Sequence, residues 1–127
     1  MIEESYVSRD TARMLKEAGF DVPCNSYYEL EDGEAVRKDC IRPYDHNGFG
    51  DTICSRPTLA LAARWLREVH NVAIYSLYDD DMEQWFYVVD AFTKNPVING
   101  FQSGSEYDDY ESAFEDGLRE AIKLIKK

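Results

Sequence analysis

The sequence predicts an α+β fold, in which an antiparallel sheet built from a β-hairpin and a three-stranded meander packs against about three helices. Two observations predict it. Three segments place apolar residues at helical spacing, and three consecutive segments late in the chain are rich in β-branched and aromatic residues and separated by short turns. The 127 residues fit a single domain, 1–127, and the hydrophobic fraction of 44% suffices for a core.

The first helix is predicted at about 9–18. Ser8 is a good N-cap, and the apolar residues that follow it lie on one helical face. Gly19 supplies the left-handed residue after the helix, and Phe20 can fold back on Leu15.

A β-hairpin is predicted next, with strands at 27–31 and 34–37. Asp32-Gly33 between two extended runs is a strong signal for a type I′ turn. Residues 42–56 are instead predicted to be irregular, because Pro, Gly, Asn and Asp are frequent there. Long loops often carry function, so this segment is the first place to expect a site.

The 42–56 segment contains Asp45, His46 and Asp51, with Cys54 close by. A Cys–His pair oriented by an Asp can act as a nucleophile, but such groups usually converge from separate segments, and a polar surface loop explains the same residues. Zinc could use Cys24, Cys40, His46 and Cys54, yet their spacing matches no known finger or ribbon. We therefore assign no catalytic residue, no metal and no cofactor.

The second helix is predicted to open at Ser55-Arg56-Pro57, with Pro57 in its first turn, and to end at His70-Asn71. Strands are predicted at 72–78, 84–92 and 97–101. Both faces of the first two carry apolar residues, so these strands are expected to be covered on both sides, at least in part.

The last helix is predicted at 110–125, with Asp109 as its N-cap. Gly117 falls within its apolar stripe and is expected to permit a close approach to the sheet beneath Trp85.

Two acidic blocks stand out in the second half of the chain. One occupies the predicted turn between strands, and the other surrounds the start of the last helix; their members are Asp79, Asp80, Asp81 and Glu83, and Glu106, Asp108, Asp109, Glu111, Glu115 and Asp116. The first block lacks the glycine and the spacing of a calcium loop. Together the blocks could form one negative face, although solvated turns and helix caps also account for them.

The net charge of −11 argues against nucleic acid or an anionic membrane as the main partner and leaves a basic protein partner open. The N-terminal residues lack the basic start and apolar run of a secretion signal, and no apolar run is long enough to span a membrane. Three Cys with no such signal indicate reduced thiols in a cytoplasm. The oligomeric state stays open.

Three stretches, 6–28, 57–71 and 110–118, together cover most of the predicted helices, and the pattern around Trp65 is the most specific part. In these stretches the chain resembles a group of small uncharacterised proteins encoded in prophages and mobile elements of gut anaerobic bacteria. The resemblance implies a cytoplasmic protein from a mobile-element setting. It carries no functional residue over to this chain, because no activity is assigned to the group.

The leading functional hypothesis is a non-enzymatic acidic protein that binds a host or phage protein. The alternative is a small enzyme or ligand-binding domain that uses the 42–56 loop, with a pocket beside His46 and a perturbed titratable group. A further alternative is an acidic mimic of DNA, which would compete with DNA for a basic host protein.

Overall fold

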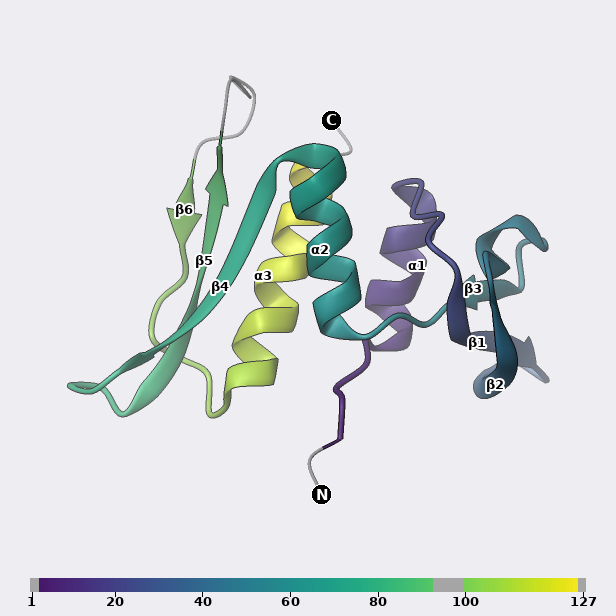
Figure 1. Cartoon of the computed structure of the whole chain (residues 1–127). Helices are drawn as coiled ribbons and strands as arrows, with labels where there is room; N and C mark the ends of the chain where they lie inside the picture. Colours follow the sequence, from purple (N-terminus) through teal and green to yellow (C-terminus); the bar gives the residue numbers. More distant parts are fainter. Residues whose placement is uncertain (1–2, 93–99, 126–127) are drawn as a thin grey trace. The chain divides into compact units, whose positions relative to one another are not determined.

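The computed structural model describes residues 3–92 and 100–125, and it has the predicted α+β architecture (Figure 1). The described residues contain three α-helices and two three-stranded antiparallel sheets, so the hairpin and the meander belong to separate sheets. The chain divides into two compact units, Met1–Leu61 and Ala62–Lys127, which are described separately below. That the chain forms one domain stays a prediction.

Helix α1, Arg9–Glu17, is fixed by its two ends as predicted. The Ser8 hydroxyl accepts a hydrogen bond from the Thr11 amide, and Gly19 adopts a φ of 94°. The Phe20 amide then donates to the Leu15 carbonyl at 2.9 Å. Because Thr11, Ala12 and Leu15 are the buried residues of α1, the rest of its circumference is left for polar side chains.

The first unit contains one sheet in the order β2-β1-β3, with β1 at Cys24–Glu31, β2 at Glu34–Tyr44 and β3 at Ile53–Ser55. The turn between β1 and β2 has Asp32 at φ 50° and Gly33 at φ 82°, which are the positive angles of the predicted type I′ turn. In β1, alternate residues face opposite sides of the sheet, and this alternation decides which side chains can meet.

The prediction that 42–56 is irregular was wrong at both ends. Strand β2 continues to Tyr44, and Ile53–Ser55 forms β3 against β1; a short 3-10 helix, η1 at His46–Gly48, lies between them. The pairing of β1 with β2 slips between Ser26↔Asp39 and Cys24↔Tyr44. The slip leaves 40–43 as a bulge, where a proline is tolerated because no ladder hydrogen bond is required.

The second unit takes most of helix α2, Leu59–His70, followed by β4 at Val72–Asp79, β5 at Gln84–Ala91, β6 at Phe101–Gln102 and α3 at Tyr110–Ile125. The three strands form a second sheet in the order β4-β5-β6. The second predicted helix starts later than expected. The Thr58 hydroxyl, and not Pro57, occupies its start, where it accepts from the Leu61 amide. Residues 97–99 of the third predicted strand lie outside the described residues.

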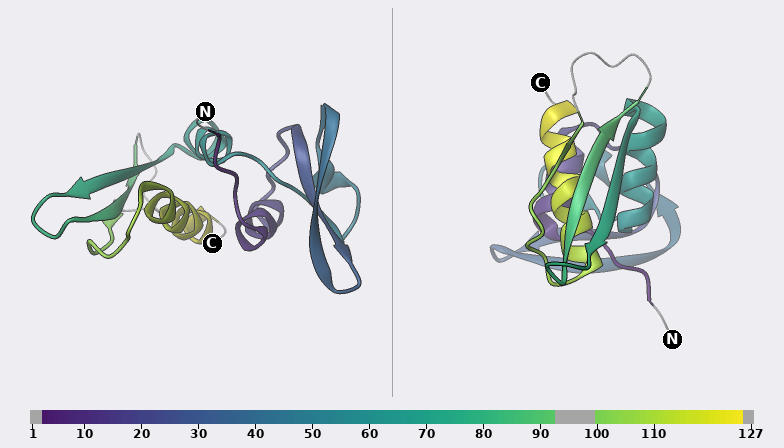
Figure 2. Two further views of the ribbon diagram at one scale, coloured as in Figure 1. Left: turned by 90° about the horizontal axis from the view of Figure 1, so that it is seen from below. Right: turned by 90° about the vertical axis from the view of Figure 1, so that its left-hand side faces the viewer.

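Both helices of the second unit lie on the same side of its sheet, as the right-hand view of Figure 2 shows. The core between helices and sheet contains fully buried apolar side chains from α2, β4, β5 and α3: Leu66, Val72, Val89, Leu118 and Ile122. Asn71, at φ 58°, provides the left-handed residue that turns the chain from α2 into β4. Within the described residues no helix has both the length and the apolar character needed to cross a membrane.

Gly117 marks the closest approach of α3 to the sheet. A Cβ atom placed there would lie 2.9 Å from Cβ of Tyr87 and 3.1 Å from Cγ2 of Ile74. The predicted close approach is therefore confirmed, but the residues beneath Gly117 are Tyr87 and Ile74 and not Trp85. Trp85 packs instead against the start of α3, with its ring centroid 5.6 Å from that of Tyr110.

Candidate functional site

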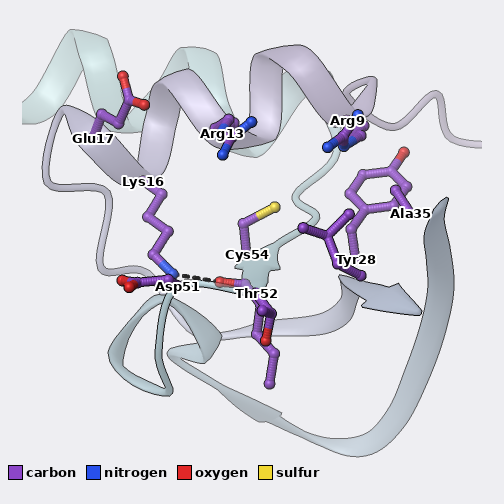
Figure 3. Close-up of a pocket in the computed structure, with 11 residues that line it drawn as sticks. Arg9, Arg13, Lys16, Glu17, Tyr28, Ala35, Asp51, Thr52 and Cys54 are labelled. Carbon is purple, nitrogen blue, oxygen red and sulfur yellow. Dashed lines mark hydrogen bonds between the residues drawn. The ribbon is translucent and has the colours of Figure 1, made fainter. Parts of the chain in front are cut away.

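A pocket of about 500 Å³ opens in the first unit between helix α1 and one face of the sheet (Figure 3). Its lining comes from α1, from all three strands and from the turn before β3: Arg9, Arg13, Lys16, Glu17, Tyr28, Leu30, Ala35, Asp51, Thr52, Ile53 and Cys54. A volume of this size is within the usual range for sites that hold small molecules.

The helical wall of the pocket carries three cationic side chains. Arg9, Arg13 and Lys16 are four and three residues apart, a spacing that places them on one face of α1. The Lys16 ammonium donates to the backbone carbonyls of Gly50 and Ile53 and so ties α1 to the segment that leads into β3. Among residues 3–92 and 100–125, neither Arg9 nor Arg13 forms an ion pair.

The sheet wall of the pocket is largely apolar, for a reason of register. Tyr28 pairs with Cys54 on β3, and Leu30 pairs with Ala35 on β2. Paired residues and alternate residues along a strand share one face, so these four side chains point to the same side of the sheet. That side faces α1, and the side chains form the floor of the pocket.

Cys54 lies below the cationic wall of α1, between Arg9 and Arg13 in Figure 3. Burial raises the pKa of its thiol, while the positive charges of Lys16, Arg13 and Arg9 act in the opposite direction. Because burial dominates, the thiol is protonated at neutral pH and is a poor nucleophile.

His46 packs against the other face of the same sheet. Its ring stacks on Tyr27, with 4.4 Å between ring centroids, and its Nε2 atom lies 2.9 Å from the Cys24 carbonyl oxygen. Tyr27 and Tyr28 are adjacent in β1 and face opposite sides, so the sheet separates His46 from Cys54. The hypothesis of a Cys54–His46 nucleophile is therefore wrong.

His46 is 4% exposed, and its surroundings give it a structural role. Its backbone amide donates to the Ser55 hydroxyl, and the neighbouring Asp45 carboxylate accepts from the Asn47 amide. The Asn47 side chain joins two segments, since its Nδ2 donates to the Phe20 carbonyl at 2.8 Å and its Oδ1 accepts from the Ser55 amide at 2.9 Å. These bonds fasten 45–49 to β3.

Of the three candidates in 42–56, Asp51 alone lines the described pocket, while Asp45 and His46 do not. In the described part of the chain, no three His, Cys, Asp or Glu side chains are grouped so that they could hold a metal ion. Burial, the largest cause, together with the charge of Asp45, raises the pKa of the Cys24 thiol to about 11, so this cysteine is protonated as well.

The second unit brings the two acidic blocks together at one end of its sheet. The Ser105 hydroxyl donates to the Asp79 carboxylate at 2.7 Å, and Trp85 exchanges backbone hydrogen bonds with Tyr107. The Ser105 hydrogen bond helps to hold the pKa of Asp79 below its usual range, so Asp79 is ionised at neutral pH.

Several acidic residues in these blocks also have local structural roles. The Asp79 carboxylate closes the β4–β5 turn by accepting from two amides within it. Asp109 is the N-cap of α3, as predicted, and accepts from the Ser112 amide at 2.7 Å. The exposed members at this end, which we call the acidic end, are Asp80, Asp81, Glu83, Glu106, Asp108, Asp109 and Glu111.

The face of the second sheet that points away from the helices carries apolar side chains. Tyr75 pairs with Val88, and Leu77 pairs with Phe86, across β4 and β5. We call these four residues the outer patch. Tyr75 is 50% exposed and Leu77 is 47% exposed, whereas Ile74 and Ser76, between and beside them, are buried against α3. The expected cover on both sides is therefore wrong for this face: among the described residues, the outer face is apolar but accessible to solvent.

The sequence alone does not predict the pocket or its cationic helical wall. The one sequence feature that points toward it is the spacing of Arg9, Arg13 and Lys16, which places them opposite the apolar stripe of α1. That signal identifies a charged face but not a pocket, because the opposing wall comes from strands that pair far along the chain.

No protein-family model matches this chain, and no curated protein or solved structure is significantly similar to it.

Proposed function

We propose that this chain is a non-enzymatic binding protein that docks a basic protein of a host or phage on the second unit. The observation that carries the proposal is the outer patch, two cross-strand apolar pairs beside the acidic end whose β4 members, Tyr75 and Leu77, are half-exposed. Isolated apolar residues are common on protein surfaces, but contiguous ones rimmed by charge are typical of interaction sites.

The composition of the outer patch fits the centre of an interface. Aromatic side chains contribute most of the binding energy in such centres because they bury large areas at little conformational cost. Tyr75 and Phe86 would fill this role, with Leu77 and Val88 packed beside them. The acidic end would form the polar rim on one side of the contact, and it would speed encounter with a positively charged partner.

A second copy of the same chain is a poorer occupant for the outer patch. Each copy carries a net charge of −11, so two copies repel one another before any apolar contact is made. A catalytic function receives no support from Cys54 and His46, which lie on opposite faces of the first sheet. A non-enzymatic role and a basic partner together agree best with these features.

The test uses the tagged full-length chain as bait in lysate of the native host, with substitutions on and off the proposed surface. Leu77→Ser removes an exposed apolar side chain from the outer patch, and Ile41→Ser removes one that is 98% exposed on the first unit. Asp80→Asn with Asp81→Asn lowers the charge of the acidic end, and Glu3→Gln with Glu4→Gln is its matched control. Circular dichroism confirms that every variant is folded.

We expect one basic partner, lost in Leu77→Ser, weakened in the Asp80/Asp81 variant and by rising salt, and retained in both controls. A partner that binds all variants equally would contradict the proposal. Self-association that Leu77→Ser abolishes, measured by light scattering, would identify a second copy as the occupant instead. Displacement of the partner by DNA would favour the DNA-mimic hypothesis.

A further inference from the structure

We propose that the pocket of the first unit binds a small organic anion, in which an apolar or aromatic body carries a phosphate or carboxylate head. Arg9 and Arg13 would hold the head, and the apolar floor formed by Leu30 and Ala35 would receive the body. This site is separate from the outer patch, and it stands whether or not the second unit binds a protein.

The first reason is the sign of the charge. The chain has 25 acidic and 14 basic residues, yet three of those basic residues gather on one wall of a single pocket. Guanidinium groups present a planar fork of donors that matches the oxygens of phosphate and carboxylate. Two arginines one helical turn apart can each contribute such a fork to the same anion.

The arrangement of charges within the pocket favours one end for the anionic head. In Figure 3, Glu17 and Asp51 lie at the end of Lys16, where their carboxylates offset its charge. Arg9 lies beside Tyr28, away from both carboxylates, and Arg13 lies between Arg9 and the Lys16 end. An anion is therefore attracted to the Arg9–Arg13 end and repelled from the other.

The groups around Tyr28 keep that end positive and fixed. The Tyr28 hydroxyl donates to the Val7 carbonyl at 2.8 Å and accepts from Nε of Arg56 at 3.2 Å. Arg56 is itself held over the Tyr6 ring, with 4.0 Å between the guanidinium carbon and the ring centroid. A third guanidinium therefore adds to the positive potential behind the Tyr28 ring.

The second reason is the floor of the pocket. Leu30 and Ala35 offer apolar surface, and Tyr28 offers an aromatic ring, next to the two arginines. A bare inorganic ion leaves this surface exposed to water, whereas a ligand with an apolar body covers it. Arg9 and Arg13 are exposed, so solvent screens their attraction, and we expect a simple probe to bind with a Kd on the order of 0.1–1 mM.

The experiment is a titration of the ¹⁵N-labelled full chain with four small probes, followed by NMR. Phenyl phosphate and benzoate combine an aromatic body with the two possible heads, inorganic phosphate lacks the body, and benzyl alcohol lacks the charge. The variants are Arg9→Gln and Arg13→Gln, and the matched control is Arg67→Gln, an exposed helical arginine of the second unit. Which of the first two probes binds more tightly assigns the head.

We expect phenyl phosphate, benzoate or both to shift the amides of Arg13, Ala35 and Cys54, and each pocket variant to weaken that binding at least ten-fold. Arg67→Gln should leave it unchanged. Benzyl alcohol that binds as tightly as the anionic probes, or affinities within two-fold of the original in both pocket variants, would overturn the proposal. Inorganic phosphate that binds as tightly as phenyl phosphate would refute the role of the apolar floor.

Cys54 supplies an independent readout inside the pocket. Anionic iodoacetate and neutral iodoacetamide alkylate the same thiol, and the positive wall should favour the anionic reagent at Cys54. We expect the ratio of the two rates to fall at Cys54 in Arg13→Gln and to stay constant at Cys40, which lies outside the pocket lining. An unchanged ratio at Cys54 would contradict a positive potential in the pocket.

Discussion

Gly117→Ala tests how closely α3 lies on the second sheet. The added Cβ would sit 2.9 Å and 3.0 Å from Cβ and Cγ of Tyr87, and 3.1 Å from Cγ2 of Ile74. Carbon atoms prefer a separation of about 3.5–4.0 Å. The Cβ of Tyr87 is attached directly to the β5 backbone and cannot rotate away, so either the helix or the strand must shift.

Two effects of opposite sign decide the outcome. Alanine stabilises a helix interior by about 1 kcal/mol relative to glycine. Overpacking a well-filled core costs about 1–3 kcal/mol, and three contacts at or below 3.1 Å place this site in the upper part of that range. We expect Gly117→Ala to lower the free energy of unfolding by about 1 kcal/mol. Gly117→Val adds two further methyl groups and should lower it more.

Urea unfolding followed by tryptophan fluorescence measures this effect in the correct unit, because both tryptophans, Trp65 and Trp85, belong to the second unit. With a slope of about 1.5 kcal/mol/M, a loss of about 1 kcal/mol lowers the midpoint by roughly 0.7 M. The control is Gly104→Ala, where an added Cβ meets no atom within 4 Å and the midpoint should barely move. A midpoint for Gly117→Ala at or above that of the original chain would refute the reasoning.

Three further outcomes follow from local contacts. Asp109→Ala should cost about 1 kcal/mol at pH 7 through loss of the helix cap. Hydrogen bonding, chiefly from the Ser112 amide, lowers the pKa of Asp109 below 3.8. The stabilisation by the Asp109 carboxylate is therefore present above pH 3.8 and is lost as the pH falls through the lowered pKa. The urea midpoints of the original chain and of Asp109→Ala should accordingly converge below about pH 4. Asn47→Asp removes the donor to a backbone carbonyl and should cost about 2 kcal/mol by circular dichroism, whereas Asn25→Asp, at an exposed site, should cost little. Cys24, with a pKa of about 11, has only about 0.1% thiolate at pH 8 and should react with iodoacetamide at least ten-fold more slowly than Cys40 in the folded chain, and equally fast in denaturant.

Elements bounded by local chemistry could be predicted to within one or two residues. The Ser8 cap, the positive φ of Gly19 and the Asp109 cap each act within one helical turn, and the observed ends of α1 and α3 agree with them. The Asp32-Gly33 turn is local in the same sense. At such positions the flanking residues contain the information that determines the structure.

Strand β3 shows where this kind of reasoning stops. It contains three residues, too few to show any periodicity, and it follows a segment rich in turn-forming residues. Its partners, Tyr27–Glu29, are more than twenty residues earlier in the chain. The pairing with β1, together with the bonds that Asn47 makes to Phe20 and Ser55, determines the strand, and none of these contacts is visible in the local sequence.

Residue type alone identifies the candidate residues in 42–56. Because successive side chains in a strand face opposite sides of the sheet, these residues lie on different faces. Cys54 points to the pocket side and Ser55 to the other, where His46 is bound. A shift of one residue in the register of β3 would exchange the two sides and bring Cys54 to His46. The catalytic hypothesis therefore depended on a register that sequence alone does not provide.

Net charge does not locate a site, because it is a sum that conceals local segregation of charge. A chain of −11 still gathers Arg9, Arg13 and Lys16 on one face of α1, while the acidic end collects carboxylates on the second unit. Added salt weakens attraction at both surfaces in the same direction, so the salt dependence of binding cannot assign a ligand to either of them. Substitutions can: Arg13→Gln should affect only small anions, and Asp80→Asn with Asp81→Asn should affect only a basic protein. A ligand sensitive to both changes would mean that the two surfaces do not act independently.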